Sequence, residues 1–177
     1  MSYITKEYAM ELLENNQTPE HVILHCMEVA RVSEILAGEL NKYGYNLSLE
    51  VIKGAAMLHD ISRVDENHGE AGARIAESKG FLREADIIKN HMHYQITDDV
   101  NNLREIDIVC LGDRMVKEGQ YVGLKLRMDY ILNKFKNNPK AEETIKMRIF
   151  EYIILVKKIE NLIGKSIDDL IIEKGNK

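Results

Sequence analysis

The chain of 177 residues has no tryptophan, two prolines, two cysteines, and no apolar run near the roughly 20 residues of a membrane-spanning helix. Charges are spread through the N-terminal segment, and the apolar block of a signal peptide is missing. Cys26 and Cys110 lie in apolar patterns without CxxC spacing, which indicates buried thiols, although a bridge between them stays open. These absences predict a cytoplasmic protein that does not enter a membrane.

An excess of positive charge is also missing. The 24 basic and 29 acidic residues give a formal net charge of −5, and the basic residues are scattered. This balance argues against binding to nucleic acid polymers. A small phosphorylated partner remains compatible with it, because a bound metal ion can supply positive charge that the sequence does not show. The chain has neither a GxSxG element nor a P-loop, so no nucleophilic serine of that type is expected.

Apolar residues recur with helical spacing along the whole chain, and no strand-like alternation of useful length occurs. Thr18-Pro19-Glu20 has the pattern of a helix start with Thr18 as its N-cap, Ser48 opens another helix, and Asn67 and Glu70 have capping-box spacing. The predicted helices cover 5–14, 19–41, 49–60, 71–79, 82–92, 103–117, 126–135 and 141–163. We therefore predict an all-α fold of one domain over 1–177, with a core at about 18–136 and a C-terminal helix, 141–164, packed on it.

Four ionisable residues lie on the apolar stripes of four different predicted helices: His25, His59, His91 and Asp113. A single histidine in such a position is usually a hydrogen-bonded core residue. A buried, unpaired carboxylate such as Asp113 costs several kcal/mol or becomes neutral. Several such residues that converge on one core call for a shared positive partner, and a divalent cation bound by imidazole and carboxylate groups meets that need.

The order of these residues is more specific than any one of them. His25 is followed by His59-Asp60 in the run Ala-Ala-Met-Leu-His-Asp-Ile-Ser, and then by Asp113 in Leu-Gly-Asp-Arg. This arrangement resembles the HD-domain superfamily of metal-dependent phosphohydrolases. The resemblance implies a compact helical bundle with helical additions at both ends, in which these four residues bind a first divalent metal ion.

Two further segments resemble HD proteins that hold two metal ions. They are His68-Gly69-Glu70-Ala71-Gly72-Ala73 and Ile87-Ile88-Lys89-Asn90-His91, and the full set is similar to bacterial di-iron hydrolases of symmetric dinucleoside tetraphosphates. The resemblance implies a second ion on His68 and His91, with Asp60 bridging both ions. The chain departs from those enzymes after His91, where it reads Met-His-Tyr-Gln, and around the final aspartate. His93 therefore stays open as a substitute for His91, and His21 is interpreted as a surface residue.

Basic residues beside the predicted ligands are candidates for substrate contacts. Arg63 and Arg114 suit the planar geometry of a phosphate group, Lys117 less so, and with Asp60 the two arginines form the predicted catalytic set. We expect one or two ions (Fe, Mn, Co, Ni or Mg) and a nucleotide or dinucleoside polyphosphate as substrate, hydrolysed by a metal-activated water. A catalytically silent HD module that binds a nucleotide or regulates a partner, a di-iron oxygenase, and a homodimer all remain open.

Overall fold

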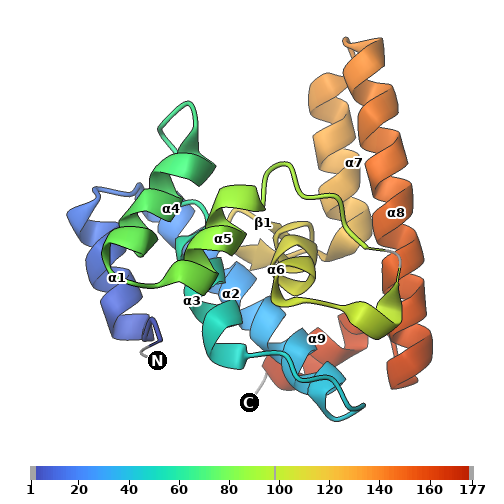
Figure 1. The fold of residues 1–177 in the computed structure, drawn as a ribbon. Helices are drawn as coiled ribbons and strands as arrows, with labels where there is room; N and C mark the ends of the chain where they lie inside the picture. Colours follow the sequence, from blue (N-terminus) through green and yellow to red (C-terminus); the bar gives the residue numbers. More distant parts are fainter. Residues whose placement is uncertain (1–2, 98, 176–177) are drawn as a thin grey trace.

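The computed structural model describes residues 3–97 and 99–175 and is almost entirely helical, as Figure 1 shows. In chain order the elements are α1 (Lys6–Asn15), α2 (Glu20–Asn41), α3 (Leu49–Leu58), α4 (His68–Ser78), α5 (Leu82–Asn90), the 3-10 turn η1 (Val100–Asn102), α6 (Glu105–Asp113), β1 (Val116–Lys117), β2 (Gln120–Tyr121), α7 (Gly123–Phe135), α8 (Pro139–Ile163) and α9 (Ile167–Gly175). The predicted all-α fold is confirmed. No helix in the described ranges has both the length and the apolar character needed to cross a membrane.

A small β-hairpin corrects the predicted helix over 103–117 and the expectation of no strands. Helix α6 already ends at Asp113, and Val116–Lys117 pairs antiparallel with Gln120–Tyr121. The two residues between the strands, Glu118 and Gly119, both have positive φ, 51° and 77°. This is the backbone geometry of a tight hairpin turn, and glycine adopts it without steric cost.

Two of the three predicted side-chain caps are not formed, although Asn67 does occupy the N-cap position of α4. The Ser48 side chain does accept from the backbone N–H of Val51 at the start of α3. Thr18 instead donates its hydroxyl to the carbonyl of Ile61 at 2.8 Å, so a tertiary contact takes the group that would have capped α2. Asn67 makes no side-chain cap, and α4 begins directly at His68 rather than at Ala71.

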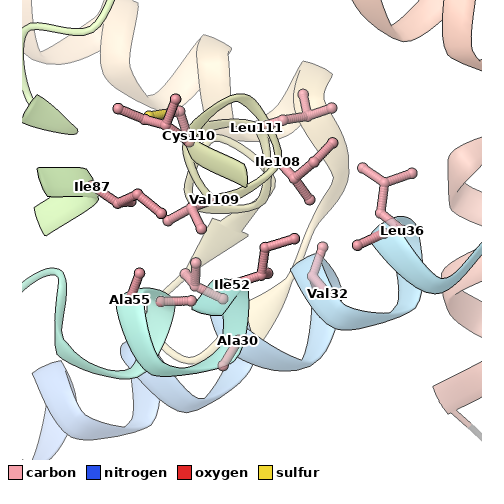
Figure 2. Close-up of a cluster of buried hydrophobic side chains, with 14 of the residues drawn as sticks. Ala30, Val32, Leu36, Ile52, Ala55, Ile87, Ile108, Val109, Cys110 and Leu111 are labelled. Atoms are coloured by element: carbon pink, nitrogen blue, oxygen red, sulfur yellow. The ribbon is translucent and has the colours of Figure 1, made fainter. Parts of the chain in front are cut away.

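The core forms where α2, α3, α5 and α6 meet. In Figure 2, which looks along α6, side chains of the other three helices point toward it from below and from one side. Ile108 and Leu111 of α6, Val32 and Leu36 of α2, and Ile52 of α3 are completely buried. Helix α9, which the sequence pattern did not predict, packs on α2 through its own buried residues Ile167, Leu170 and Ile171.

Two glycines let helices approach closely beside the predicted ligands. A Cβ atom on Gly112 would lie 2.3 Å from the Ser33 hydroxyl oxygen, so a larger residue would require the Ser33 hydroxyl to move where α6 packs on α2. A Cβ on Gly69 would lie 3.0 Å from the carbonyl oxygen of Lys89, where α4 meets α5. The first contact brings Asp113 toward α2, and the second brings His68 toward α5.

Helices α7 and α8 form an antiparallel pair that stands at one side of the molecule in Figure 1. The pair is capped at the start of α8 by Asn138, whose side chain accepts from the N–H of Ala141. It ends at Gly164, which has φ 70° and closes α8 in the left-handed conformation.

Candidate metal centre

Three of the six predicted metal ligands lie in helices, and the other three directly follow the ends of α3 and α5. His25 lies within α2, His68 opens α4, and Asp60 follows the end of α3. His59 and His91 are the C-cap residues of α3 and α5, and Asp113 is the last residue of α6. Three helix C-termini thus meet at one place, and the partial negative charge of their carbonyl ends favours a cation there.

The ligand atoms form two groups that share Asp60. One group is His25, His59 and Asp60, the other is Asp60, His68 and His91, and within each group the ligand atoms lie within 4.8 Å of one another. Asp113 joins the first group, since its Oδ1 is 3.0 Å from His25 Nε2 and 3.9 Å from His59 Nε2. The structure therefore brings all six residues together, and Asp60 belongs to both groups.

Hydrogen bonds fix the orientation of two imidazoles. His59 Nδ1 lies 2.8 Å from the carbonyl of Ala56, and His91 Nδ1 lies 2.7 Å from the carbonyl of Ile88. Because a carbonyl only accepts, both Nδ1 atoms carry the proton, and both Nε2 atoms present lone pairs.

Those lone pairs have no donor. His59 Nε2, His91 Nε2 and Asp60 Oδ1 are buried atoms without a hydrogen-bond partner in the described ranges. Asp60 Oδ1 lies 3.6 Å from His91 Nε2 and 3.3 Å from His68 Nε2. Several buried acceptor atoms that point at one another cost free energy unless a cation lies between them. Imidazole and carboxylate groups together are typical ligands of Zn, Fe, Mn, Co and Ni.

The charge states also suit a cation. Burial lowers the pKa of His59 to about 4, so its ring is neutral at neutral pH. Burial alone would raise the pKa of Asp60, but the imidazoles of His59, His68 and His91 in their protonated forms, together with the Arg63 guanidinium, outweigh burial and hold that pKa well below its usual range. For Asp113, the Arg114 guanidinium and His25 likewise outweigh burial and depress the pKa. Two ionised carboxylates therefore lie among the imidazoles.

Arg63 and Arg114 contact the ligands as the sequence predicted, but in different ways. Arg63 Nη1 donates to His68 Nε2 at 3.2 Å, and Arg63 Nε lies 3.6 Å from Asp60 Oδ2. Arg114 is mostly buried and donates to Asp113 Oδ2, which leaves Asp113 Oδ1 directed toward His25.

A cavity of about 360 Å³ adjoins the ligands. His25, Asp60, His91 and Asp113 line it together with Arg63 and Arg114. Sequence reasoning missed the opposite wall, which α7 and α8 supply and which includes Arg127, Tyr130, Lys134, Phe135, Arg148 and Tyr152. The available signal was basic residues at helical spacing among apolar ones, such as Arg148 between Ile145 and Ile149.

The remaining candidates belong to neither group of ligand atoms, although Cys110 Sγ lies 3.7 Å from the carbonyl oxygen of His91. His21 and His93 are exposed and belong to neither group, so His91 and not His93 lies with the other five residues. The Lys117 ammonium lies 4.2 Å from the centre of the Tyr130 ring. Cys26 and Cys110 are free and buried, and burial raises the pKa of both thiols.

Comparison with known proteins identifies the family of the chain. The family model of the HD domain matches residues 22–118, more than half of the chain, and members of this family are in general metal-dependent hydrolases. An uncharacterized protein of Methanocaldococcus jannaschii is 31% identical over 97 residues, which cover 52% of this chain and 57% of that relative. The chain thus spans little more than half of that relative's length. No solved structure matches the chain significantly.

Proposed function

Because the chain belongs to the HD-domain family, we propose that it is a metal-dependent hydrolase that cleaves a phosphate ester or phosphoanhydride of a nucleotide. The observation that carries this proposal is the set of buried acceptor atoms, His59 Nε2, Asp60 Oδ1 and His91 Nε2, that no donor in the described ranges satisfies. These atoms lie beside a cavity that arginines also line. Metal ligands next to arginines are the combination that an anionic phosphate substrate needs.

In this proposal His25, His59, Asp60 and Asp113 hold one ion, and Asp60, His68 and His91 hold a second. A divalent ion (Fe, Mn, Co, Ni or Mg) supplies Lewis acidity, which lowers the pKa of a water molecule and offsets charge on phosphoryl oxygens. Asp60 lies in both groups, so it sets the distance between the two sets of imidazoles.

The arginines act on the substrate. Arg63 now donates to the His68 Nε2 lone pair, the atom that the second ion takes. If His68 Nε2 held an ion, the half-exposed Arg63 guanidinium would be available to bind phosphoryl oxygens. Arg114 keeps its contact with Asp113 Oδ2, orients that carboxylate, and retains further N–H donors for a phosphate at the cavity wall.

Water is the nucleophile in this proposal, so no side chain needs to form a covalent intermediate; the described residues that line the cavity include no serine, threonine or cysteine. The water oxygen forms a new bond to phosphorus while the bond from phosphorus to the ester or bridging oxygen breaks. One water proton remains on the oxygen transferred to the phosphate, and the other reaches the leaving oxygen through solvent. The planar fork of Arg63 matches the charge that builds on the phosphoryl oxygens during this step.

A substrate panel tests the proposal. Protein purified without chelator is analysed for metal content, then assayed with nucleotides and dinucleoside polyphosphates in the presence of Mn, Fe, Co, Ni or Mg. We expect phosphate or nucleotide release that EDTA abolishes and that a matching metal restores. Failure of fully loaded protein to hydrolyse any member of the panel, together with oxygen uptake under reducing conditions, would instead support the di-iron oxygenase alternative.

A further inference from the structure

The α7–α8 pair forms the wall of the cavity that faces the ligands, and it lies outside the segment matched to the HD family, which ends at residue 118. On α7, Arg127, Ile131 and Lys134 are spaced four and three residues apart, so they share one helical face. On α8, Ile145, Ile149 and Tyr152 share a face in the same way, with Arg148 next to it. Both faces combine cationic groups with apolar ones.

Arg127 is a guanidinium without an acceptor. Its Nε atom is buried without a hydrogen-bond partner, and the described ranges offer the side chain no ion pair. Burial lowers the pKa of Arg127, and Arg114 and Arg63 lower it further, although Asp113 opposes them. The Asp113 carboxylate is already engaged by Arg114 and His25. A partly buried cation in this position calls for an anion that enters the cavity.

A second cation lies further along the same face. The Lys134 ammonium is 4.5 Å and the Arg127 guanidinium carbon 5.7 Å from the centre of the Tyr130 ring. Cation–π contact attracts each of them to the ring but does not neutralise their charge. Besides Asp60 and Asp113, the one carboxylate among the described lining residues is Glu151, which contacts Gln95. The α7 side of the cavity is therefore positive.

We propose that this wall binds the second phosphate of a phosphoanhydride substrate, with Arg127 as its main contact and Lys134 as a supporting charge. The inference rests on the proposed function, because the reacting phosphoryl group must lie over Asp60 and the imidazoles. Water attacks that phosphorus, the bond to the bridging oxygen breaks, and the bridging oxygen leaves with the phosphate held by Arg127. Negative charge grows on this leaving phosphate, which Arg127 stabilises.

The apolar residues of the wall indicate what kind of group is attached to the two phosphates of the substrate. Ile131, Ile145 and Ile149 line the cavity beside the cationic groups, and Phe135 lies at the same wall. A flat, weakly polar nucleobase fits such a surface. The preferred substrate is thus a nucleoside diphosphate or a longer polyphosphate of this kind, dinucleoside polyphosphates included, and not a simple phosphomonoester.

The test compares Arg127→Gln and Lys134→Gln with Lys125→Gln as a matched control. Lys125 is on the same helix but is exposed and pairs with Asp129 at 2.9 Å. Calorimetry on the metal-free chain measures binding of inorganic pyrophosphate and of inorganic phosphate. Kinetics on the metal-loaded chain compare a nucleoside diphosphate with the corresponding monophosphate, and thermal melts establish that each variant folds.

For Arg127→Gln we expect pyrophosphate binding and kcat/KM for the diphosphate to fall about 10- to 100-fold, the range for loss of a hydrogen bond to a charged group. Phosphate binding and monophosphate turnover should change less than about threefold. Lys134→Gln should show a smaller loss, and Lys125→Gln none. Equal losses for both substrates, or no loss in the folded variant, would overturn the inference while leaving the proposed function intact. Absence of turnover in the wild type would remove the proposed function, and pyrophosphate binding would still decide whether the wall is an anion site.

Discussion

Helix α6 buries one aspartate near each end, and the two carboxylates have opposite surroundings. Asp107 accepts from the Tyr94 hydroxyl at 2.7 Å and from the backbone N–H groups of Arg104 at 2.9 Å and Thr97 at 3.3 Å. Asp113 instead faces the imidazoles of His25 and His59, and its charge-paired donor is Arg114. Burial alone therefore does not identify a functional carboxylate.

The difference lies in what each carboxylate leaves unsatisfied around it. The donors to Asp107 tie the segment after His91 to the start of α6, and no atom of Asp107 is left without a partner. Around Asp113 and Asp60, the described ranges leave His59 Nε2 and Asp60 Oδ1 without donors. The first arrangement is complete as a folded protein, whereas the second leaves acceptor atoms that a cation would satisfy.

Among substitutions of these buried carboxylates, the largest effect is expected for Asp60→Ala, which removes a carboxylate that faces imidazoles. Asp60 belongs to both groups of ligand atoms, so its loss should remove metal retention and turnover together, with activity reduced at least about 1,000-fold. Elemental analysis, the hydrolysis assay and circular dichroism measure metal, turnover and helical content on the same preparation. An Asp60→Ala protein that keeps its metal and its activity would refute the shared role of this residue.

The second ion is tested by the double variant His68→Ala, His91→Ala. These residues lie only in the group that excludes His25 and His59, so metal content should fall from two ions per chain to one. Loss of one ion removes several kcal/mol of charge stabilisation, and turnover should fall on the order of 100-fold. One ion per chain in both the wild type and the variant would restrict the site to a mononuclear centre.

Much of this site follows from sequence, because helical periodicity alone places His25, His59, His91 and Asp113 on inward faces of their helices. The distinction between Asp107 and Asp113 does not follow, since the Tyr94 hydroxyl reaches Asp107 only through the irregular chain after His91. Short-range patterns also failed where a tertiary contact competed, as when the Thr18 hydroxyl took the carbonyl of Ile61.

The cavity wall on α7 and α8 was beyond sequence reasoning for a related reason. Both helices were predicted approximately, over 126–135 and 141–163, and the structure extends them to Gly123–Phe135 and Pro139–Ile163. Which of their faces meets the ligands depends on how the pair packs against the rest of the chain. Helical periodicity shows that Arg127 and Lys134 share a face, but it does not give the direction of that face.

The next effect concerns stability. Asp107→Ala should lower the free energy of unfolding by about 1–3 kcal/mol, because three donors would be left in the interior without an acceptor. Denaturant unfolding measures this loss, and metal content at saturating metal should stay at the wild-type value. Asp107→Asn is the matched variant, since it keeps one acceptor and should lose less. Loss of bound metal in folded Asp107→Ala protein would erase the distinction between the two ends of α6.

The smallest effects are expected for Arg63→Gln and Arg114→Gln. Both arginines contact a predicted metal ligand, and the two variants distinguish a contact that supports metal binding from one that supports substrate binding. Arg63 is half exposed, and its partner atom, His68 Nε2, is the one that would hold a second ion, so Arg63→Gln should raise KM about tenfold with metal content unchanged. Arg114 is mostly buried and holds Asp113 Oδ2, so Arg114→Gln should weaken metal binding as well as turnover. Glutamine keeps a neutral donor on a shorter side chain in both variants, and Arg74→Gln on α4 serves as an exposed control outside the cavity lining. Metal titration and steady-state kinetics on the three proteins separate the roles. Identical losses of metal affinity in Arg63→Gln and Arg114→Gln would show that both arginines support the ligands and that neither acts mainly on the phosphate.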